Sequence, residues 1–230
     1  MPEVTPLHEV SGDEPEDDAL RAADGRVPGR RGRATRQRLL ECTGEMLATT
    51  AYRDVKVIDI AREAGTSPAT FYQYFADVEA AILVLAQEMA LQGTHLTGLI
   101  TEGSWAGDDA AATALELVDA FLRFWDEHRA VLRVMDFATD EGDTRFQKIR
   151  VGLLNGITRA LADVTRASQS AGRLPRGTDP MATAGILVSM MAHVAAHQYG
   201  FEFWGIRTAD FRAAMARQIS WGVTGVLPPD

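Results

Sequence analysis

Hydrophobic residues recur every three or four positions along most of the chain after residue 34, which is the spacing of one face of an α-helix. From 35 to 49, for example, Leu39, Met46 and Leu47 share such a face. The ranges predicted to be helical in this way are 35–49, 57–64, 68–74, 109–126, 128–138, 143–170, 180–203 and 208–226. A further long helix is predicted from Asp77, and glycines from position 93 onward predict its decay into a loop. No stretch alternates polar and apolar residues over a strand's length, so the predicted fold is all-α.

Two short helices joined by a tight turn are predicted between positions 57 and 75. Gly65 favours the left-handed conformation that ends a helix, so the first helix is expected to end there. Ser67 followed by Pro68 predicts the start of the second, because serine caps the free N–H groups of a first turn and proline fits the first helical position. This pattern is typical of a helix-turn-helix, whose second helix points outward and can enter a groove of DNA.

The second short helix has two distinct faces. Phe71 and Phe75 fall together on one side, where they are expected to anchor the helix in the core. The opposite side carries small and hydrogen-bonding side chains suited to base edges, and two tyrosines on the flanks are suited to phosphates. The residues predicted to contact DNA from this region are Lys56, Ser67, Pro68, Ala69, Thr70, Tyr72, Gln73 and Tyr74.

This segment resembles the DNA-binding region of the tetracycline-repressor family of transcriptional regulators, the TetR/AcrR family. The resemblance is carried by Ile60-Ala61, Ala64-Gly65, Ser67 and the run Thr70-Phe71-Tyr72-Gln73-Tyr74-Phe75. It covers about residues 33–90, and beyond them only the helical pattern agrees. The resemblance implies a three-helix N-terminal DNA-binding domain, here 31–76 with a basic arm. It also implies a larger helical domain over 77–230 that binds an effector and dimerises.

The chain departs from the family pattern at two positions. Val78 stands where the family usually has a lysine that donates to a phosphate at the start of the fourth helix. We expect that contact to be lost, and the amide end of that helix or the arginine arm to compensate for it. Thr66 replaces the usual valine or isoleucine of the turn and would loosen the packing there.

Charge is distributed unevenly along the chain, whose net charge is −9. Residues 1–25 carry eight acids and one base, and residues 26–38 carry six arginines and no acid, which leaves −8 on the remaining body. Residues 1–30 lack hydrophobic periodicity and are predicted to be a disordered acidic tail. The basic run beside a helix-turn-helix predicts an arm that follows DNA phosphates. Its members in the predicted site are Arg30, Arg31, Arg33 and Arg36.

The family resemblance implies a ligand-responsive repressor: a homodimer that binds double-stranded palindromic operator DNA and is released by a small hydrophobic effector of unknown identity. Its last two long helices are expected to form the dimer seam, because small residues along a stripe let helices approach closely. The residues predicted for this seam are Met191, Phe211, Ala214, Met215, Gln218 and Gly222. The residues predicted to line an effector pocket are Phe121, Trp125, Met135, Leu154, Met190 and His193.

Two alternatives remain open at this point. One is an activator, or a repressor that needs a co-ligand. The other, from a different class, is a helical small-molecule-binding or metal-binding protein with weak DNA binding, which the valine at position 78 supports. His193 and His197 lie four residues apart with Glu202 nearby, although a histidine pair in a pocket or dimer seam is favoured over a metal site.

Several other classes of protein are disfavoured. No nucleophile elbow, phosphate-binding glycine loop, dinucleotide fingerprint or catalytic triad can be placed, so no enzyme activity, cofactor or metal is predicted. Residues 180–201 lack charge but contain several polar side chains, which favours a buried helix over a membrane span. Cys42 is the only cysteine, which fits a reducing compartment, and no secretory signal is present. We therefore expect a cytoplasmic, nucleoid-associated protein.

Overall fold

The computed structural model describes residues 29–227, and within them every regular element is a helix, as the sequence predicts. The first five elements are α1 (Arg30–Thr49), the short 3-10 helix η1 (Tyr52–Asp54), α2 (Val57–Glu63), α3 (Pro68–Tyr74) and α4 (Val78–Gln92). They are followed by α5 (Thr94–Glu102), α6 (Asp109–Glu127), α7 (Arg129–Asp140), α8 (Thr144–Ser170), α9 (Pro180–Ala196), α10 (Gln198–Phe203) and α11 (Thr208–Thr224). The predicted acidic tail lies almost wholly outside the described residues, since these begin at position 29.

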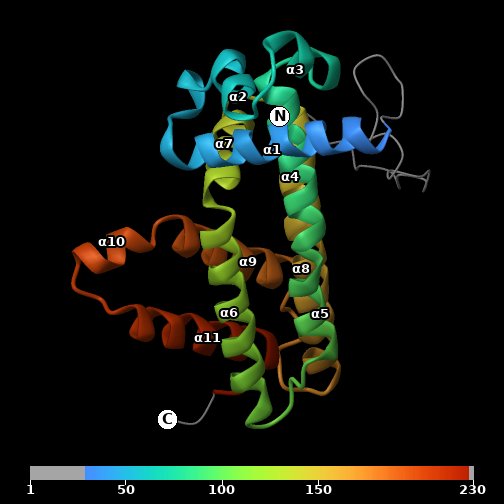
Figure 1. Ribbon diagram of the computed structural model, residues 1–230. Helices are drawn as coiled ribbons and strands as arrows, with labels where there is room; N and C mark the ends of the chain where they lie inside the picture. The colour runs from blue at the N-terminus through green and yellow to red at the C-terminus, as the bar shows by residue number, and fades with distance from the viewer. Residues whose placement is uncertain (1–28, 228–230) are drawn as a thin grey trace.

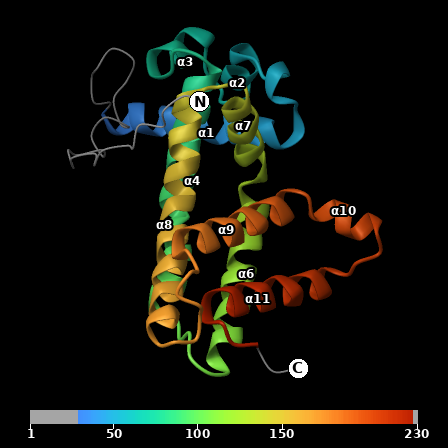
Figure 2. The ribbon, with the colours of Figure 1, turned by 180° about the vertical axis from the view of Figure 1, so that it is seen from behind.

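The helices form a small end and a larger body (Figure 1). Helices α1, α2 and α3 gather at one end, and α4 runs from them into the body. Helix α5 continues the line of α4, and α8 packs along both. Helix α6 returns toward the small end, where α7 contacts α1. Helices α9 and α11 lie side by side across α6 and α8, with one face turned outward, and α10 projects where they connect (Figure 2).

Three differences from the predicted helix ranges exceed two residues. Helix α1 begins at Arg30, five residues before the predicted start, so the arginines from position 30 onward are helical. The long helix from Asp77 ends at Gly93, but α5 follows directly instead of a loop. A β-carbon on Gly93 would lie 2.4 Å from Leu153 Cδ1, so α8 packs too close to this position for a side chain. The predicted helix 180–203 is broken at His197 into α9 and α10.

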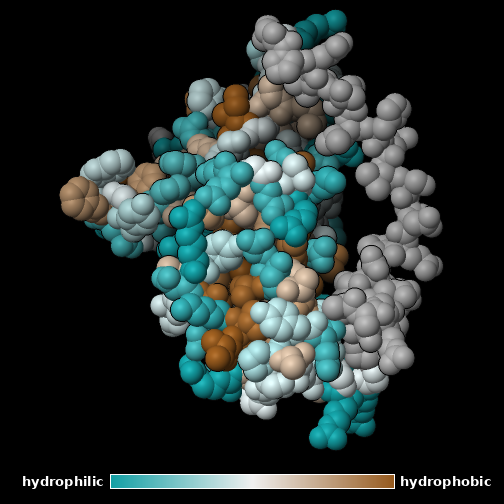
Figure 3. All heavy atoms as spheres, turned by 90° about the horizontal axis from the view of Figure 1, so that it is seen from above, coloured by the Kyte–Doolittle hydropathy of each residue, from teal (hydrophilic) through white to brown (hydrophobic). Residues whose placement is uncertain are grey.

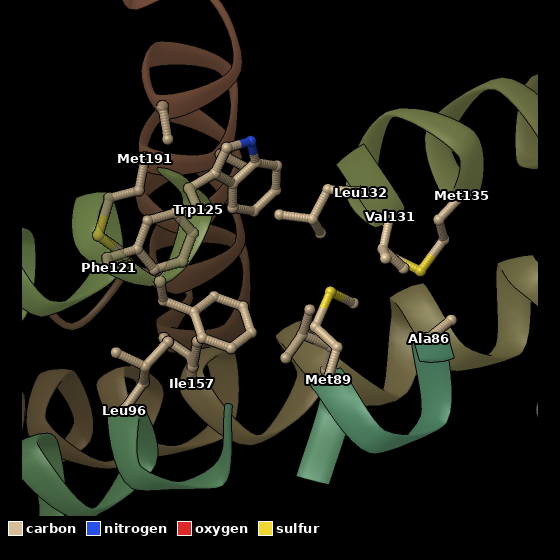
Figure 4. Close-up of a cluster of buried hydrophobic side chains, with 14 of the residues drawn as sticks. Ala86, Met89, Leu96, Phe121, Trp125, Val131, Leu132, Met135, Ile157 and Met191 are labelled. Atoms are coloured by element: carbon tan, nitrogen blue, oxygen red, sulfur yellow. The ribbon is translucent and has the colours of Figure 1, made fainter. Parts of the chain in front are cut away.

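The core of the body is packed from helices α4 to α9 together with α11, and Figure 4 shows part of it. Phe121 and Trp125 stack with ring centroids 5.3 Å apart, and both are almost completely buried. Leu96, Ile157 and Met191 approach the same cluster from α5, α8 and α9. These long apolar side chains therefore hold the body together from within one protomer.

Candidate functional site

The turn between α2 and α3 has the geometry that the sequence predicts. Gly65 is left-handed, with a φ of 66°, and the Thr66 N–H donates to the Ala61 carbonyl at 2.8 Å. The Ser67 hydroxyl accepts from the Thr70 N–H at 3.2 Å, and Pro68 occupies the first helical position. These local signals fix where α3 begins and so which of its residues face outward.

Helix α3 is anchored on one side and exposed on the other. Phe71 is fully buried, Phe75 is 3% exposed, and their ring centroids lie 5.4 Å apart. Tyr72 is 53% exposed at the surface of this end. Thr70 is half-buried, and its hydroxyl lies 3.0 Å from that of Ser67. The remaining predicted contact residues divide into exposed Lys56, Ser67, Pro68, Ala69 and Gln73, and half-buried Tyr74.

Seen from above, hydrophilic residues cover most of this end of the molecule, and hydrophobic residues gather in a smaller area (Figure 3). Within the described residues, the arginines from position 30 onward contribute to this end from the first turns of α1. Arg30, Arg31 and Arg33 are exposed there. The exposed bases and α3 therefore belong to one packed unit, since α1 contacts both α2 and α3.

Arg36 does not fit its predicted role as a DNA contact. It is only 6% exposed, and its guanidinium lies over the Phe75 ring, 5.2 Å from the centroid. Burial lowers its pKa, and the nearby Glu88 carboxylate acts in the opposite direction. The position falls on the inner face of α1, together with Leu39 and Leu40, and so packs inward. The sequence interpretation missed this because it treated the arginine run as an arm with no faces.

The start of α4 also differs from the expectation. Asp77 caps this helix, and its carboxylate accepts from the Ala80 N–H at 2.7 Å. A negative side chain already satisfies that amide end, so the end is unsuited to a phosphate. We therefore expect compensation for the missing lysine at Val78 to come from the exposed arginines of α1.

Polar contacts connect the small end to the body. The Tyr52 hydroxyl donates to Glu79 at 2.7 Å, and Arg145 reaches Glu79 at 3.4 Å. Burial, followed by the hydrogen bond to Glu79, raises the pKa of Tyr52. Asp143 caps α8 and pairs with Arg145 at 2.6 Å, and this hydrogen bond is the main reason that the pKa of Asp143 falls to about 2. Arg53 pairs with Glu141 at 2.7 Å.

An open cavity of about 1140 Å³ lies below this junction. One wall is the segment 47–53, which joins the end of α1 to η1, and another is the face of α7. Trp125 from α6 and Arg150 from α8 complete it with residues from the end of α9 and the start of α10. The side chains of the lining that carry polar or aromatic groups include Tyr52, Arg53, Trp125, Arg129, Arg133, Asp136, Phe137, Thr139, Asp140, Arg150, His197 and Tyr199.

Of the predicted pocket residues, only Trp125 lines this cavity. Phe121 and Met135 are buried in the core (Figure 4), and Leu154 and Met190 are half-buried outside the lining. His193 is exposed and stacks on His197, with ring centroids 4.4 Å apart. The prediction selected bulky apolar residues, but those are the residues that a helical body uses to fill itself.

The cavity is lined by arginines that the sequence analysis did not single out. Arg129 and Arg133 lie one helical turn apart on α7, and Arg150 pairs with Asp136 at 2.5 Å. Burial raises the pKa of Asp136, and Arg150 counteracts this effect. The Thr139 hydroxyl is buried without a hydrogen-bond partner in the described part of the chain. The spacing of Arg129, Arg133 and Asp136 along one face was the available signal.

Three of the six predicted dimer residues are core residues of a single protomer. Met191, Phe211 and Met215 are 0%, 5% and 4% exposed, because their stripe faces inward from α9 and α11. Ala214 and Gln218 are exposed on α11, and Gly222 is half-buried, where a β-carbon would lie 3.1 Å from Leu187 Cδ1. The prediction therefore combined two sides of α11: the side with residues 214, 218 and 222, and the buried side that carries Phe211 and Met215.

The outward face of α9 and α11 carries a different set of apolar residues. Ile186 is 70% exposed and Met181 45% exposed on α9, and Trp221 is 47% exposed on α11. Ala213 and Ala214 are also exposed on α11. We call these five residues, Met181, Ile186, Ala213, Ala214 and Trp221, the outer apolar face.

A helix-turn-helix with an anchored second helix, mounted on a larger helical body with a cavity, defines a DNA-binding transcriptional regulator rather than an enzyme. Residues 96–230 match the protein family described as "Tetracyclin repressor-like, C-terminal domain". Residues 39–80 match the family described as "Bacterial regulatory proteins, tetR family". The chain belongs to the TetR family.

Relatives support the same assignment. The chain is 24% identical over 199 residues to the uncharacterised HTH-type transcriptional regulator YdgC of Bacillus subtilis, covering 86% of this chain and 95% of that protein. The fatty acid degradation regulator FadR of Bacillus halodurans has a similar fold, with a TM-score of 0.62 and 15% identity. The match covers 87% of this chain and 98% of that one. The structure of the transcriptional regulator FadR from Bacillus subtilis in complex with stearoyl-CoA is also similar, with a TM-score of 0.60 and 16% identity. The match covers 83% of this chain and 98% of that one.

Two further features of the described residues bear on the sequence analysis. None of their helices is both long and apolar enough to cross a membrane. No group of three or more His, Cys, Asp or Glu side chains among them is arranged to hold a metal ion.

Proposed function

We propose that this TetR-family regulator is a homodimeric repressor that binds a palindromic operator and leaves it when a small molecule enters the cavity. The observation that carries the proposal is the shared wall of segment 47–53. This segment belongs to the DNA-binding end and also lines the cavity, so a ligand there contacts the end that carries α3.

In the proposed complex, α3 lies in the major groove. Ala69, Thr70 and Gln73 meet base edges, and Tyr72 reaches a phosphate from the flank. Arg31, Arg33 and Lys56 are exposed on the same end and neutralise phosphates on either side. Arg36 takes no part, because it is buried behind Phe75.

In the proposed dimer, the outer apolar face of each protomer packs against that of its partner as a four-helix bundle. Its exposed isoleucine, methionine and tryptophan would lose water contact on association, which is the main driving force for such interfaces. The alanines at 213 and 214 allow α11 to approach its partner closely. A two-fold axis through this bundle sets two α3 helices on successive turns of the DNA, about 35 Å apart.

A gel shift and footprint with DNA upstream of the protein's own gene test the proposal. We expect protection of two inverted half-sites whose centres lie about one helical turn apart. Ligand-induced release distinguishes a repressor from an activator or a co-ligand-dependent repressor, for which a ligand would strengthen binding. Absence of sequence-specific binding would instead support the alternative of a helical small-molecule-binding protein.

A further inference from the structure

One face of α7 presents a row of polar and aromatic side chains to the cavity. Arg129, Arg133, Asp136, Phe137 and Asp140 follow one another at the spacing of a single helix face, and all five line the cavity. The two basic residues come first, and the two acidic residues lie toward the end of the helix. The basic residues therefore occupy the end of the row where α7 begins, and His197 and Tyr199 also line the cavity.

Most of the charged groups around the cavity are already paired. Arg150 pairs with Asp136 at 2.5 Å, and Arg53 pairs with Glu141 at 2.7 Å while lying over the Phe137 ring. Arg129 uses one terminal nitrogen on Asp126 at 2.5 Å, which leaves its other guanidinium donors available. The Arg133 side chain makes neither an ion pair nor a hydrogen bond with any other residue in 29–227.

We propose that the cavity binds an amphipathic organic anion, whose carboxylate or phosphate is held by Arg133 with support from Arg129. Two guanidinium groups one turn apart offer donors that match the oxygens of either group. The apolar part of the ligand lies against Trp125, which is 2% exposed and stacks on Phe121 at the core. This inference rests on the proposed function for the ligand's role as effector, but its charge selectivity does not depend on DNA binding.

A cationic ligand is disfavoured by the positions of the acids. Asp136 is neutralised by Arg150, so it is not available to a ligand cation. Asp140 is exposed and lies seven residues beyond Arg133, about 10 Å further along the helix axis at a rise of about 1.5 Å per residue. A cation placed at Asp140 would sit beside Arg53 and away from Trp125.

Isothermal titration calorimetry with matched twelve-carbon ligands tests the proposal below their micelle-forming concentrations. The ligands are dodecanoate, lauroyl-CoA, dodecan-1-ol and dodecyltrimethylammonium. We expect at least one of the two anions to bind at least tenfold more tightly than the alcohol and the cation. Preference for dodecanoate would identify a free carboxylate as the recognised group, and preference for lauroyl-CoA would identify a phosphate-bearing ligand.

The variant Arg133→Gln separates recognition of charge from recognition of the chain. It should weaken anion binding about tenfold or more and leave binding of the alcohol unchanged. Arg159→Gln is the matched control, because Arg159 is exposed on α8 and does not line the cavity. Equal binding of the alcohol or the cation, no binding by either anion, or an Arg133→Gln variant that binds anions like the wild type would overturn the proposal.

The result can be told apart from failure of the proposed function. Titration is carried out without DNA, and operator binding is measured separately on the same protein. If the protein selects anions but binds no operator, the anion-binding proposal stands and the repressor proposal fails. If the protein binds operator but does not select anions, the repressor proposal stands and the anion-binding proposal fails.

Discussion

The guanidinium of Arg36 lies 5.2 Å from the centre of the Phe75 ring, so a member of the basic run closes the core behind α3. A cation over an aromatic face is attracted by the electron-rich face of the ring. Phe75 in turn contacts Phe71, which anchors the outward-facing helix. We therefore expect Arg36 to act on DNA binding through the position of α3, and Arg31 to act through its charge.

Replacing these two arginines should give different results. Arg31→Gln should weaken binding to all DNA sequences and reduce the salt slope by about one, because one phosphate contact is lost. Arg36→Ala should lower the free energy of unfolding by about 1–2 kcal/mol, through lost packing and cation–π attraction, and leave the salt slope unchanged. Fluorescence anisotropy over a range of salt, together with thermal unfolding, measures both effects. A reduced slope in Arg36→Ala would return this residue to the DNA surface.

Gln73 and Phe71 test the two faces of α3. Gln73→Ala should leave the melting temperature unchanged and reduce discrimination at one base pair of each half-site, at a cost of about 1–3 kcal/mol. Phe71→Ala should destabilise the protein by about 3–5 kcal/mol, because it empties a fully buried site. Competition binding with single-base operator variants and thermal unfolding provide the measurements. Equal loss for every operator variant would show that Gln73 contacts only the backbone.

The Asp143–Arg145 pair predicts an acid-dependent loss of stability. The pKa of Asp143 falls from 3.8 to about 2 on folding, so the carboxylate contributes stability above pH 4 that is lost between pH 4 and pH 2. Asp143→Asn keeps a capping residue but removes the charge, so it should be less stable at neutral pH and lose less stability over that interval. Thermal unfolding from pH 2 to pH 7 tests this. Asp163→Asn is the control, since Asp163 pairs with Arg166 at an exposed position.

The outer apolar face predicts the effect of a buried charge on assembly. Ile186→Glu should convert the proposed dimer to a monomer, because two carboxylates would meet at the two-fold axis without partners. Size-exclusion chromatography with light scattering gives the mass directly. Leu91→Glu is the matched control, because Leu91 is 71% exposed on α4, outside this face. Dimers of unchanged stability in Ile186→Glu would place the interface elsewhere.

The elements that the sequence predicted best are those with signals inside a few residues. Gly65, Ser67 and Pro68 predicted the end of α2, the turn and the start of α3, because conformation and capping at these positions depend on the residues themselves. The position of Phe71 and Phe75 followed from the start of the helix. The arrangement of this end of the molecule was therefore accessible before any tertiary contact was known.

The cavity and the outer apolar face were not predictable in the same way. Both depend on which side of a long helix meets the rest of the body, and α9 and α11 carry apolar residues on more than one side. Met191 and Ile186 are similar in size and lie on one helix, yet the first is fully buried and the second 70% exposed. The cavity likewise forms between segments far apart in sequence, such as Arg53 and Arg150.

Segment 47–53 has one consequence for how the regulator would work in a cell. This segment belongs to the DNA-binding end and also lines the cavity, so in the proposed function a ligand there is coupled to the operator. By thermodynamic linkage, a ligand that weakens operator binding is itself bound more weakly by the operator complex. Operator-bound molecules would hold the ligand more weakly than free ones by the same factor. A promoter with many copies would thus raise the ligand concentration needed for induction.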